Sequence, residues 1–128
     1  MQYPVMHPFP ASEDLQFLIG LEIGQVCLDP WSTQFRFSEG GQMSIEGQFE
    51  HVDVQGCSHI HQSGDKRDVG PVFLRALTQQ RIEALEVGPL SLTLRFSSGA
   101  TLRIQSDGGP YECGQIYPPG RPDNPIVF

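Results

Sequence analysis

Residues 33–46, TQFRFSEGGQMSIE, align without a gap on residues 92–105, LTLRFSSGATLRIQ. The offset is 59 positions, and five of the fourteen pairs are identical, among them Phe37 and Phe96. The same offset matches apolar positions as far back as Leu18 in the first copy. An apolar register that persists over this length indicates duplication of one supersecondary unit.

Each copy has the pattern of a short helix followed by antiparallel strands. Apolar and polar residues alternate over 33–38 and 92–97, which is typical of a half-buried strand. The segments SEGG and SSGA then supply turns, in which glycine takes a positive φ. We expect further strands near 22–28, 43–45, 49–54, 82–87, 102–104 and 111–117, and short helices near Ser12, as an N-cap, and Pro71, in a first turn.

The 128 residues fit a single domain. The internal repeat covers 12–55 and 71–117, and a polar, glycine-punctuated linker over 56–70 joins its copies. A proline-rich tail over 118–128 is expected to be extended, and to dock only if its apolar end finds a groove. We therefore predict an α+β fold, mostly β, in which two pseudo-symmetric copies of a helix and β-meander pack as one sandwich- or barrel-like domain.

The charge distribution is acidic and uneven. The chain contains eight Lys and Arg and 15 Asp and Glu, which gives a net charge of −7. Residues 1–65 alone have a net charge of −8. Nucleic acids and anionic membranes bind basic surfaces, so both are excluded as expected partners. An acidic half attracts a basic protein or a cation. The alternative is an ordinary solvated acidic surface.

The cysteines and the hydropathy pattern predict a cytoplasmic protein. Cys27, Cys57 and Cys113 are widely spaced and form no CxxC motif, which indicates reduced thiols. No stretch approaches the roughly 20 apolar residues of a membrane-spanning helix. The first residues also lack the basic and apolar regions of a secretory signal.

Four residues form a candidate metal site. Cys57, His59 and His61 are spaced two apart, so in an extended segment their side chains share one face. Thiolate and imidazole ligands suit zinc, and His51 from the preceding strand completes the set. The paired spacings of structural zinc sites are missing, however. The alternative is a solvated polar loop that holds no cofactor.

No catalytic motif occurs in the chain. The sequence contains no GxSxG, P-loop, GxGxxG or HExxH pattern, and we identify no convincing nucleophile–base pair. We therefore expect that the protein is not an enzyme.

Trp31, the single tryptophan, lies in the turn-like sequence Asp29–Ser32, with proline at the second position. Tryptophan is enriched at the centres of protein interfaces, although Trp31 could equally fold over the end of the core. The candidate partner-binding residues are Trp31, Glu39, Glu46, Glu50 and Asp53. An unpaired outer strand would also permit a homodimer.

The closing motifs of the two copies are Ile45–Phe49, IEGQF, and 111–114, YECG. With the repeated RFSxG segments, they resemble a family of small uncharacterised bacterial proteins with a duplicated β-hairpin unit. The resemblance covers about residues 15–117 and implies the architecture but no activity. Gln48 and Gly114 depart from the usual proline-like and aromatic positions of that pattern.

These observations predict a small, soluble, non-catalytic protein-interaction module of the inhibitor or immunity type, with an acidic N-terminal half. The alternative is a domain that binds a small molecule or a transition metal through the segment of Cys57, His59 and His61.

Overall fold

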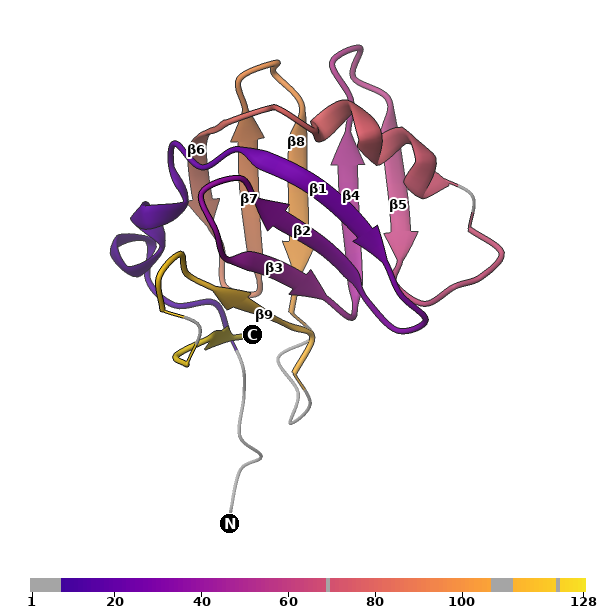
Figure 1. Ribbon diagram of the computed structural model, residues 1–128. Helices are drawn as coiled ribbons and strands as arrows, with labels where there is room; N and C mark the ends of the chain where they lie inside the picture. The colour runs from indigo at the N-terminus through magenta and orange to yellow at the C-terminus, as the bar shows by residue number, and fades with distance from the viewer. Residues whose placement is uncertain (1–7, 69, 107–111, 122) are drawn as a thin grey trace.

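Two antiparallel sheets of five strands pack against each other in the computed structural model, which describes residues 8–68, 70–106, 112–121 and 123–128 (Figure 1). The first sheet contains, in spatial order, β1 (Ile23–Leu28), β2 (Thr33–Phe37), β3 (Gln42–Ile45), β9 (Gly114–Tyr117) and β10 (Ile126–Val127). The second contains β5 (Ser58–Gln62), β4 (Gln48–Val52), β8 (Thr101–Gln105), β7 (Ser91–Phe96) and β6 (Ile82–Val87). The prediction of a mostly β fold is confirmed.

Two short 3₁₀ helices, η1 (Ser12–Leu18) and η2 (Gly70–Leu77), lie where helices are expected. The expected N-cap is wrong by one residue, because η1 begins after Ala11 and has no side-chain cap. The Ser12 hydroxyl instead accepts a hydrogen bond from Gln16 Nε2 at 3.1 Å. Both helices are short, so buried leucines rather than helix propensity hold them in place.

The hairpins β1–β2 and β6–β7 have the same register. Ile23 pairs with Phe37, Ile82 pairs with Phe96, and a bulge follows Ile23 and Ile82 at the same place. Both phenylalanines are buried in the core. The two irregularities are 59 residues apart, the offset of the repeat, although the residues there, Gly24 and Glu83, differ.

The two hairpins meet where β1 and β6 begin. The Ile23 amide donates to the Gln80 carbonyl at 3.0 Å, and the Ile82 amide donates to the Leu21 carbonyl at 2.9 Å. The two bonds are equivalent under the repeat, because the two donors, Ile23 and Ile82, and the two acceptors, Leu21 and Gln80, are each 59 residues apart. These bonds join the edges of the two sheets.

Neither sheet is built from one copy alone. After β3 the chain crosses to the second sheet, where β4 pairs with β8; after β8 it returns, and β9 pairs with β3. Each copy therefore contributes strands to the sheet that the other copy begins. The local sequence pattern does not reveal this exchange.

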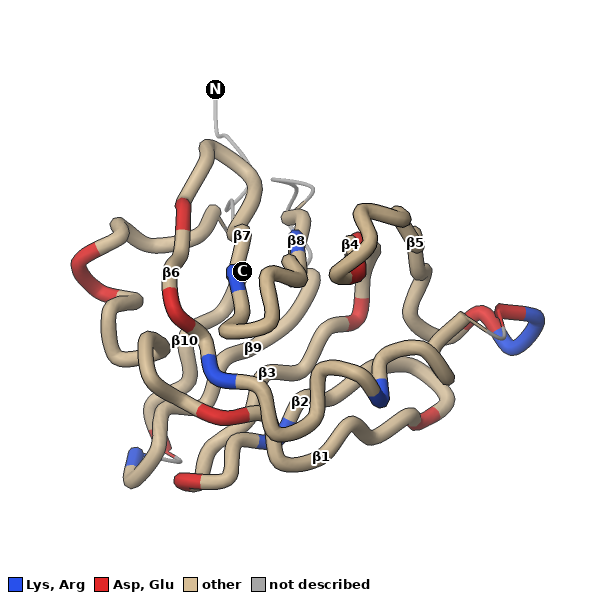
Figure 2. Tube along the Cα trace, turned by 90° about the horizontal axis from the view of Figure 1, so that it is seen from above, with Lys and Arg blue, Asp and Glu red and all other residues tan. Residues whose placement is uncertain are grey.

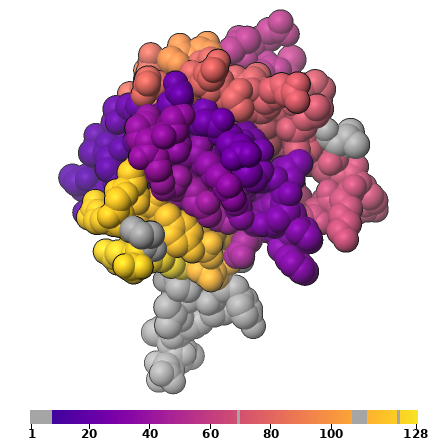
Figure 3. Space-filling view, viewed as in Figure 1, coloured from indigo at the N-terminus to yellow at the C-terminus, as the bar shows by residue number. Residues whose placement is uncertain are grey.

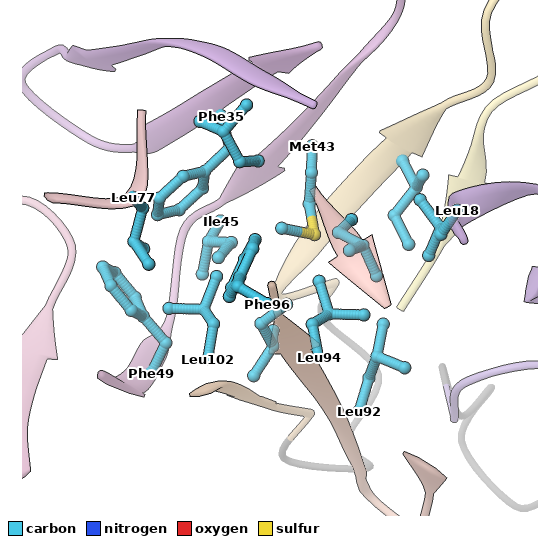
Figure 4. Close-up of a cluster of buried hydrophobic side chains, with 14 of the residues drawn as sticks. Leu18, Phe35, Met43, Ile45, Phe49, Leu77, Leu92, Leu94, Phe96 and Leu102 are labelled. Atoms are coloured by element: carbon cyan, nitrogen blue, oxygen red, sulfur yellow. The ribbon is translucent and has the colours of Figure 1, made fainter. Parts of the chain in front are cut away.

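The core lies between the sheets, and Figure 4 shows side chains from both of them pointing toward one another. The fully buried side chains labelled there are Leu18, Phe35, Met43, Ile45, Phe49, Leu77, Leu92, Leu94, Phe96 and Leu102. Alternation along the strands places all of them inward except Leu18 and Leu77, which come from η1 and η2.

The expected linker is more ordered than predicted, and the tail docks through its apolar end. The linker over 56–70 contains β5, in which His59 and His61 face inward and Ile60 faces outward. In the tail, β10 pairs with β9, and Phe128 is fully buried. Residue 111, where the last predicted strand and the YECG motif begin, lies outside the described residues.

No helix in the part of the chain that the structure describes is both long and apolar enough to cross a membrane.

Candidate functional site

Three inward-facing histidines lie on β4 and β5. His51 pairs with His59 across the two strands, and Phe49 pairs with His61. We call His51, His59 and His61 the histidine edge, because β5 is the outer strand of its sheet. Strand alternation brings their side chains to one face, as the spacing of His59 and His61 predicts.

His51 is the most enclosed member of the histidine edge. Its side chain is buried, and neither ring nitrogen has a hydrogen-bond partner among the described residues. Loss of solvation is the main cause that lowers its pKa below the ordinary 6.5, and repulsion from His59 and His61 lowers the pKa further. The ring is therefore held neutral in an apolar setting.

His59 is partly exposed and contacts a carboxylate. Its Nε2 lies 3.1 Å from Asp53 Oδ2, and its ring stacks on Phe73 of η2 at 5.2 Å between centroids. Amide hydrogen bonds, above all that from Cys57, and the contact with His59 lower the pKa of the Asp53 carboxyl. Asp53 therefore fixes both the turn before β5 and the His59 ring.

His61 is 2% exposed and is oriented from both sides. Its ring packs against Phe49 at 5.0 Å, and its Nδ1 lies 3.0 Å from Asp68 Oδ2. The other oxygen of Asp68 accepts the Gly70 amide at 2.8 Å, which fixes the carboxylate at the start of η2. Because a carboxylate only accepts, Nδ1 is the donor in the contact with Asp68.

His61 lines a cavity of about 290 Å³ between the β1–β2 turn and the loop after β5. The Thr33 and Ser63 hydroxyls, 3.2 Å apart, form part of its wall. The remaining lining residues are Leu28, Asp29, Pro30, Ser32, Gln62, Gly64, Asp65, Lys66, Asp68 and Pro71. Figure 2 shows the acidic and basic positions of the loop after β5 at the side of the molecule.

The structure brings the candidate metal residues only partly together. His51, His59 and His61 share one face, whereas Cys57 is exposed in the turn before β5. Among the described residues, no three His, Cys, Asp or Glu side chains are placed to hold one metal ion. His59 and His61 each contact a carboxylate of their own instead.

No known protein family, curated protein or solved structure matches the chain.

The candidate partner-binding residues separate into two groups. Glu39 accepts hydrogen bonds from the Glu22 amide and Arg81, Glu50 accepts one from Ser58, and Asp53 holds the turn before β5. These three carboxylates are engaged within the chain. The other two residues, Trp31 and Glu46, line one surface depression with Pro30, Ser63, Gly64 and Lys66.

Asp68 and the Thr33–Ser63 pair are the site residues that sequence reasoning missed. Asp68 lies seven positions after His61, and the hydroxyls are 30 positions apart. No short motif connects them. The one available signal was the alternation of His59, Ile60 and His61, which indicates a strand with histidines on one face.

Proposed function

We propose that this chain is a non-catalytic protein-binding module, and that its partner presents a basic surface to Trp31. The tryptophan side chain is 77% exposed at the tip of the β1–β2 hairpin. In Figure 3, this hairpin lies beside the loop after β5 on the visible face. A large exposed aromatic residue on a rigid turn is typical of an interface anchor.

Asp29 makes the turn rigid. Its carboxylate accepts hydrogen bonds from the Trp31 amide at 2.9 Å, from the Ser32 amide and hydroxyl at 2.6 and 2.7 Å, and from Gln34 Nε2 at 3.0 Å. These bonds, that of the Ser32 hydroxyl foremost, lower the pKa of Asp29, so it stays ionised at neutral pH. A turn ordered before binding loses less conformational entropy on association.

The surroundings of Trp31 favour a cationic side chain. Trp31 and Glu46 line the same depression of about 600 Å³, which also contains Lys66. An Arg or Lys of the partner placed over the indole gains a cation–π contact, and Glu46 adds an opposite charge. The net charge of −8 over residues 1–65 attracts a basic partner over longer distances.

The matching turn of the second copy carries different chemistry. Residues 88–91 read GPLS where residues 29–32 read DPWS, and both turns close with the same amide-to-carbonyl bond. The identical registers and exchanged bonds support the inference that two copies of one unit are related by an approximate twofold axis. Leu90 occupies the position of Trp31, so the chain contains its own control turn.

The experiment compares capture by the wild type with capture by three variants. Each protein is immobilised and exposed to a lysate of the cells that make it, and a captured protein is then purified and titrated. We expect a basic partner whose affinity falls by at least about 30-fold in Trp31→Ala, as for an interface anchor. Glu46→Lys is expected to slow association, and the decrease shrinks at high salt.

Leu90→Ala is the matched control, because it truncates the equivalent turn. It is expected to bind like the wild type. Equal binding by Trp31→Ala and Leu90→Ala, or a captured partner that is acidic, would contradict the proposed function.

A further inference from the structure

The outer edge of β5 presents backbone hydrogen-bonding groups that the rest of the described chain leaves almost unused. Two amide-to-carbonyl bonds bracket the β4–β5 ladder, from Asp53 to Cys57 at 3.0 Å and from Ser63 to Gly47 at 3.1 Å. Hydrogen-bonded and non-hydrogen-bonded pairs alternate along an antiparallel ladder. The register therefore turns the N–H and C=O groups of alternate β5 residues away from β4, namely those of Ser58, Ile60 and Gln62. Among the described residues, only the carbonyl of Gln62 has a backbone partner on this side.

β5 also lacks the features that protect an edge strand from pairing. Native edges are commonly blocked by charged side chains, proline or bulges. The outer strands β1 and β6 each have an irregularity near their start, and β6 contains Glu83 and Glu86. The remaining outer strand, β10, has only two residues. β5 has the sequence SHIHQ, without Asp, Glu, Lys, Arg or Pro, and pairs with β4 in continuous register, so it is the outer strand best suited to accept another.

The side chain of Ile60 makes this edge apolar at its centre. It is 63% exposed on the outer face of the sheet, where the neighbouring β5 positions are polar. Ile60 lines a depression of about 580 Å³ together with Gln48, Gln62, Asp65, Arg67 and Asp68. An added strand would cover this isoleucine, and a β-branched or aromatic residue opposite it would stabilise the pair.

The loop after β5 joins this depression to the surface around Trp31. Asp65 lines the β5 depression, and the residues on either side of it line the depression that contains Trp31 and Glu46. The Arg67 amide is the main cause that lowers the pKa of the Asp65 carboxyl, so this group is ionised at neutral pH. With Asp68, the carboxylates outnumber the single cation of the β5 depression. A basic segment is therefore favoured over an acidic one along this path.

We propose that the partner binds through an extended basic segment, which pairs with the edge of β5 as a sixth strand of the second sheet, next to Trp31. The inference rests on the proposed function, because it assigns a binding mode to the same partner. Figure 1 shows β5 as the last strand at its side of this sheet. In strand addition, main-chain hydrogen bonds supply affinity, and alternate side chains of the added segment supply specificity.

The test uses a random dodecapeptide library displayed on phage, so it does not depend on the capture of a natural partner. The library is selected on the immobilised wild type, and enriched peptides are synthesised and added to ¹⁵N-labelled protein. We expect basic peptides that slow hydrogen exchange of the Ile60 amide at least about tenfold, because a hydrogen-bonded amide exchanges only when the bond opens. The Val26 amide is the internal control, since it points from the outer edge of β1 in the same way, and its exchange rate is expected to stay unchanged.

Two variants test the pairing from the side of the protein. Ile60→Pro removes the outward N–H but no hydrogen bond to β4, and it is expected to weaken peptide binding at least about tenfold. Ile60→Val keeps the N–H and the branched side chain, and it is expected to bind like the wild type. Amide spectra show whether both variants keep the fold, and the exchange measurement on the wild type decides the question without them.

Three results would overturn the inference: no enriched peptide, enriched peptides that are acidic, or binding that leaves Ile60 exchange unchanged or slows Val26 instead. The fluorescence of Trp31, the single tryptophan, separates this inference from the proposed function. A peptide that changes the fluorescence but not Ile60 exchange contradicts strand addition alone. A peptide that slows Ile60 exchange but leaves the fluorescence unchanged supports strand addition and contradicts the role proposed for Trp31.

Discussion

The outer strands of the two sheets invite comparison, because they pair with matching positions. In the second sheet, Leu102 of β8 lies opposite His51 of β4, which pairs in turn with His59 of β5. His61 is two residues further along β5. In the first sheet, Met43 of β3 lies opposite Ile116, and the corresponding residues further out are Ile126 and Phe128. We call Ile116, Ile126 and Phe128 the apolar edge.

The apolar edge consists of apolar side chains, whereas the histidine edge consists of polar imidazole rings. Phe128 is fully buried and stacks on Phe9 at 4.5 Å between ring centroids. In contrast, His51 and His61 leave three buried ring nitrogens without partners among the described residues. Local choices that oppose stability are expected where a protein functions, so this difference supports the proposal that the functional site lies on the side of the histidine edge.

The largest effect is expected from Phe128→Ala. The substitution removes a fully buried ring from the apolar edge, and a large-to-small change of this kind costs about 3–5 kcal/mol. Urea unfolding followed by fluorescence measures the loss. Trp31→Ala, at an exposed position, is expected to stay within about 0.5 kcal/mol by circular dichroism. A loss below 1 kcal/mol in Phe128→Ala would show that the tail does not dock as described.

Gly114→Ala tests how closely the apolar edge is packed. Gly114 corresponds to Phe49 in the other sheet, and an added Cβ would lie 2.5 Å from Phe128 Cζ and also meet the Ser44 carbonyl. Overpacking of this kind costs about 1–3 kcal/mol. Gly47→Ala is the matched control, because its Cβ would approach Cys113 Cβ only to 3.4 Å, an ordinary contact. Equal unfolding free energies for the two variants would contradict the close packing.

His51→Ile converts one position of the histidine edge into its apolar counterpart. Removing two unsatisfied ring nitrogens is expected to stabilise the protein by about 1 kcal/mol at pH 7.5. The difference in unfolding free energy between His51→Ile and the wild type is expected to grow as the pH is lowered. The pKa of His51 is below 6.5 in the folded state, so the unfolded chain binds more protons and wild-type stability falls as the pH drops through 6.5.

Urea unfolding of the wild type and His51→Ile between pH 7.5 and 5 measures this difference. The groups that act on His51 are His59, His61 and Asp53, and all three are retained in the variant. A constant difference in unfolding free energy across this range would show that His51 does not titrate with a lowered pKa.

The sequence predicted the strands of the repeat because their inward residues are apolar and their alternation is local. It did not predict β5, because His59 and His61 are polar in any hydropathy count although both face inward. Tertiary contacts bury His61 and partly cover His59, and each ring has one nitrogen within hydrogen-bond distance of a carboxylate, Asp68 and Asp53 respectively. A buried histidine is therefore indistinguishable from a loop histidine in the sequence alone.

The candidate site was predicted in part for a similar reason. The charge of Glu46 follows from residue type and the turn pattern at Asp29–Ser32 is local, whereas the sequence left open whether Trp31 is exposed. Whether a carboxylate faces a partner or holds its own chain depends on distant residues, as with Glu39 and Arg81, which are 42 positions apart. The same is true of the cavity, whose walls come from two separate turns.

The smallest effect concerns the partly exposed contact of the histidine edge, between His59 and Asp53. In His59→Ile the edge gains the residue type found at Ile126, and Asp53 loses a hydrogen-bond partner. The pKa of Asp53 is then expected to rise toward its ordinary 3.8 but to stay below it, because the Cys57 amide, the largest cause of the lowering, still donates. Carboxyl ¹³C shifts followed from pH 6 to 2 measure the change, with Asp65 as an internal reference, since its hydrogen bonds come from Arg67.

A carboxylate whose pKa is lowered in the folded state stabilises the protein at pH values above its pKa in the unfolded chain, and this stabilisation is lost as the pH falls through the folded-state pKa. The variant is therefore less sensitive to acid in this range than the wild type. An unchanged Asp53 pKa would show that the hydrogen bonds of the turn alone lower the pKa of this carboxyl and that the contact with His59 does not.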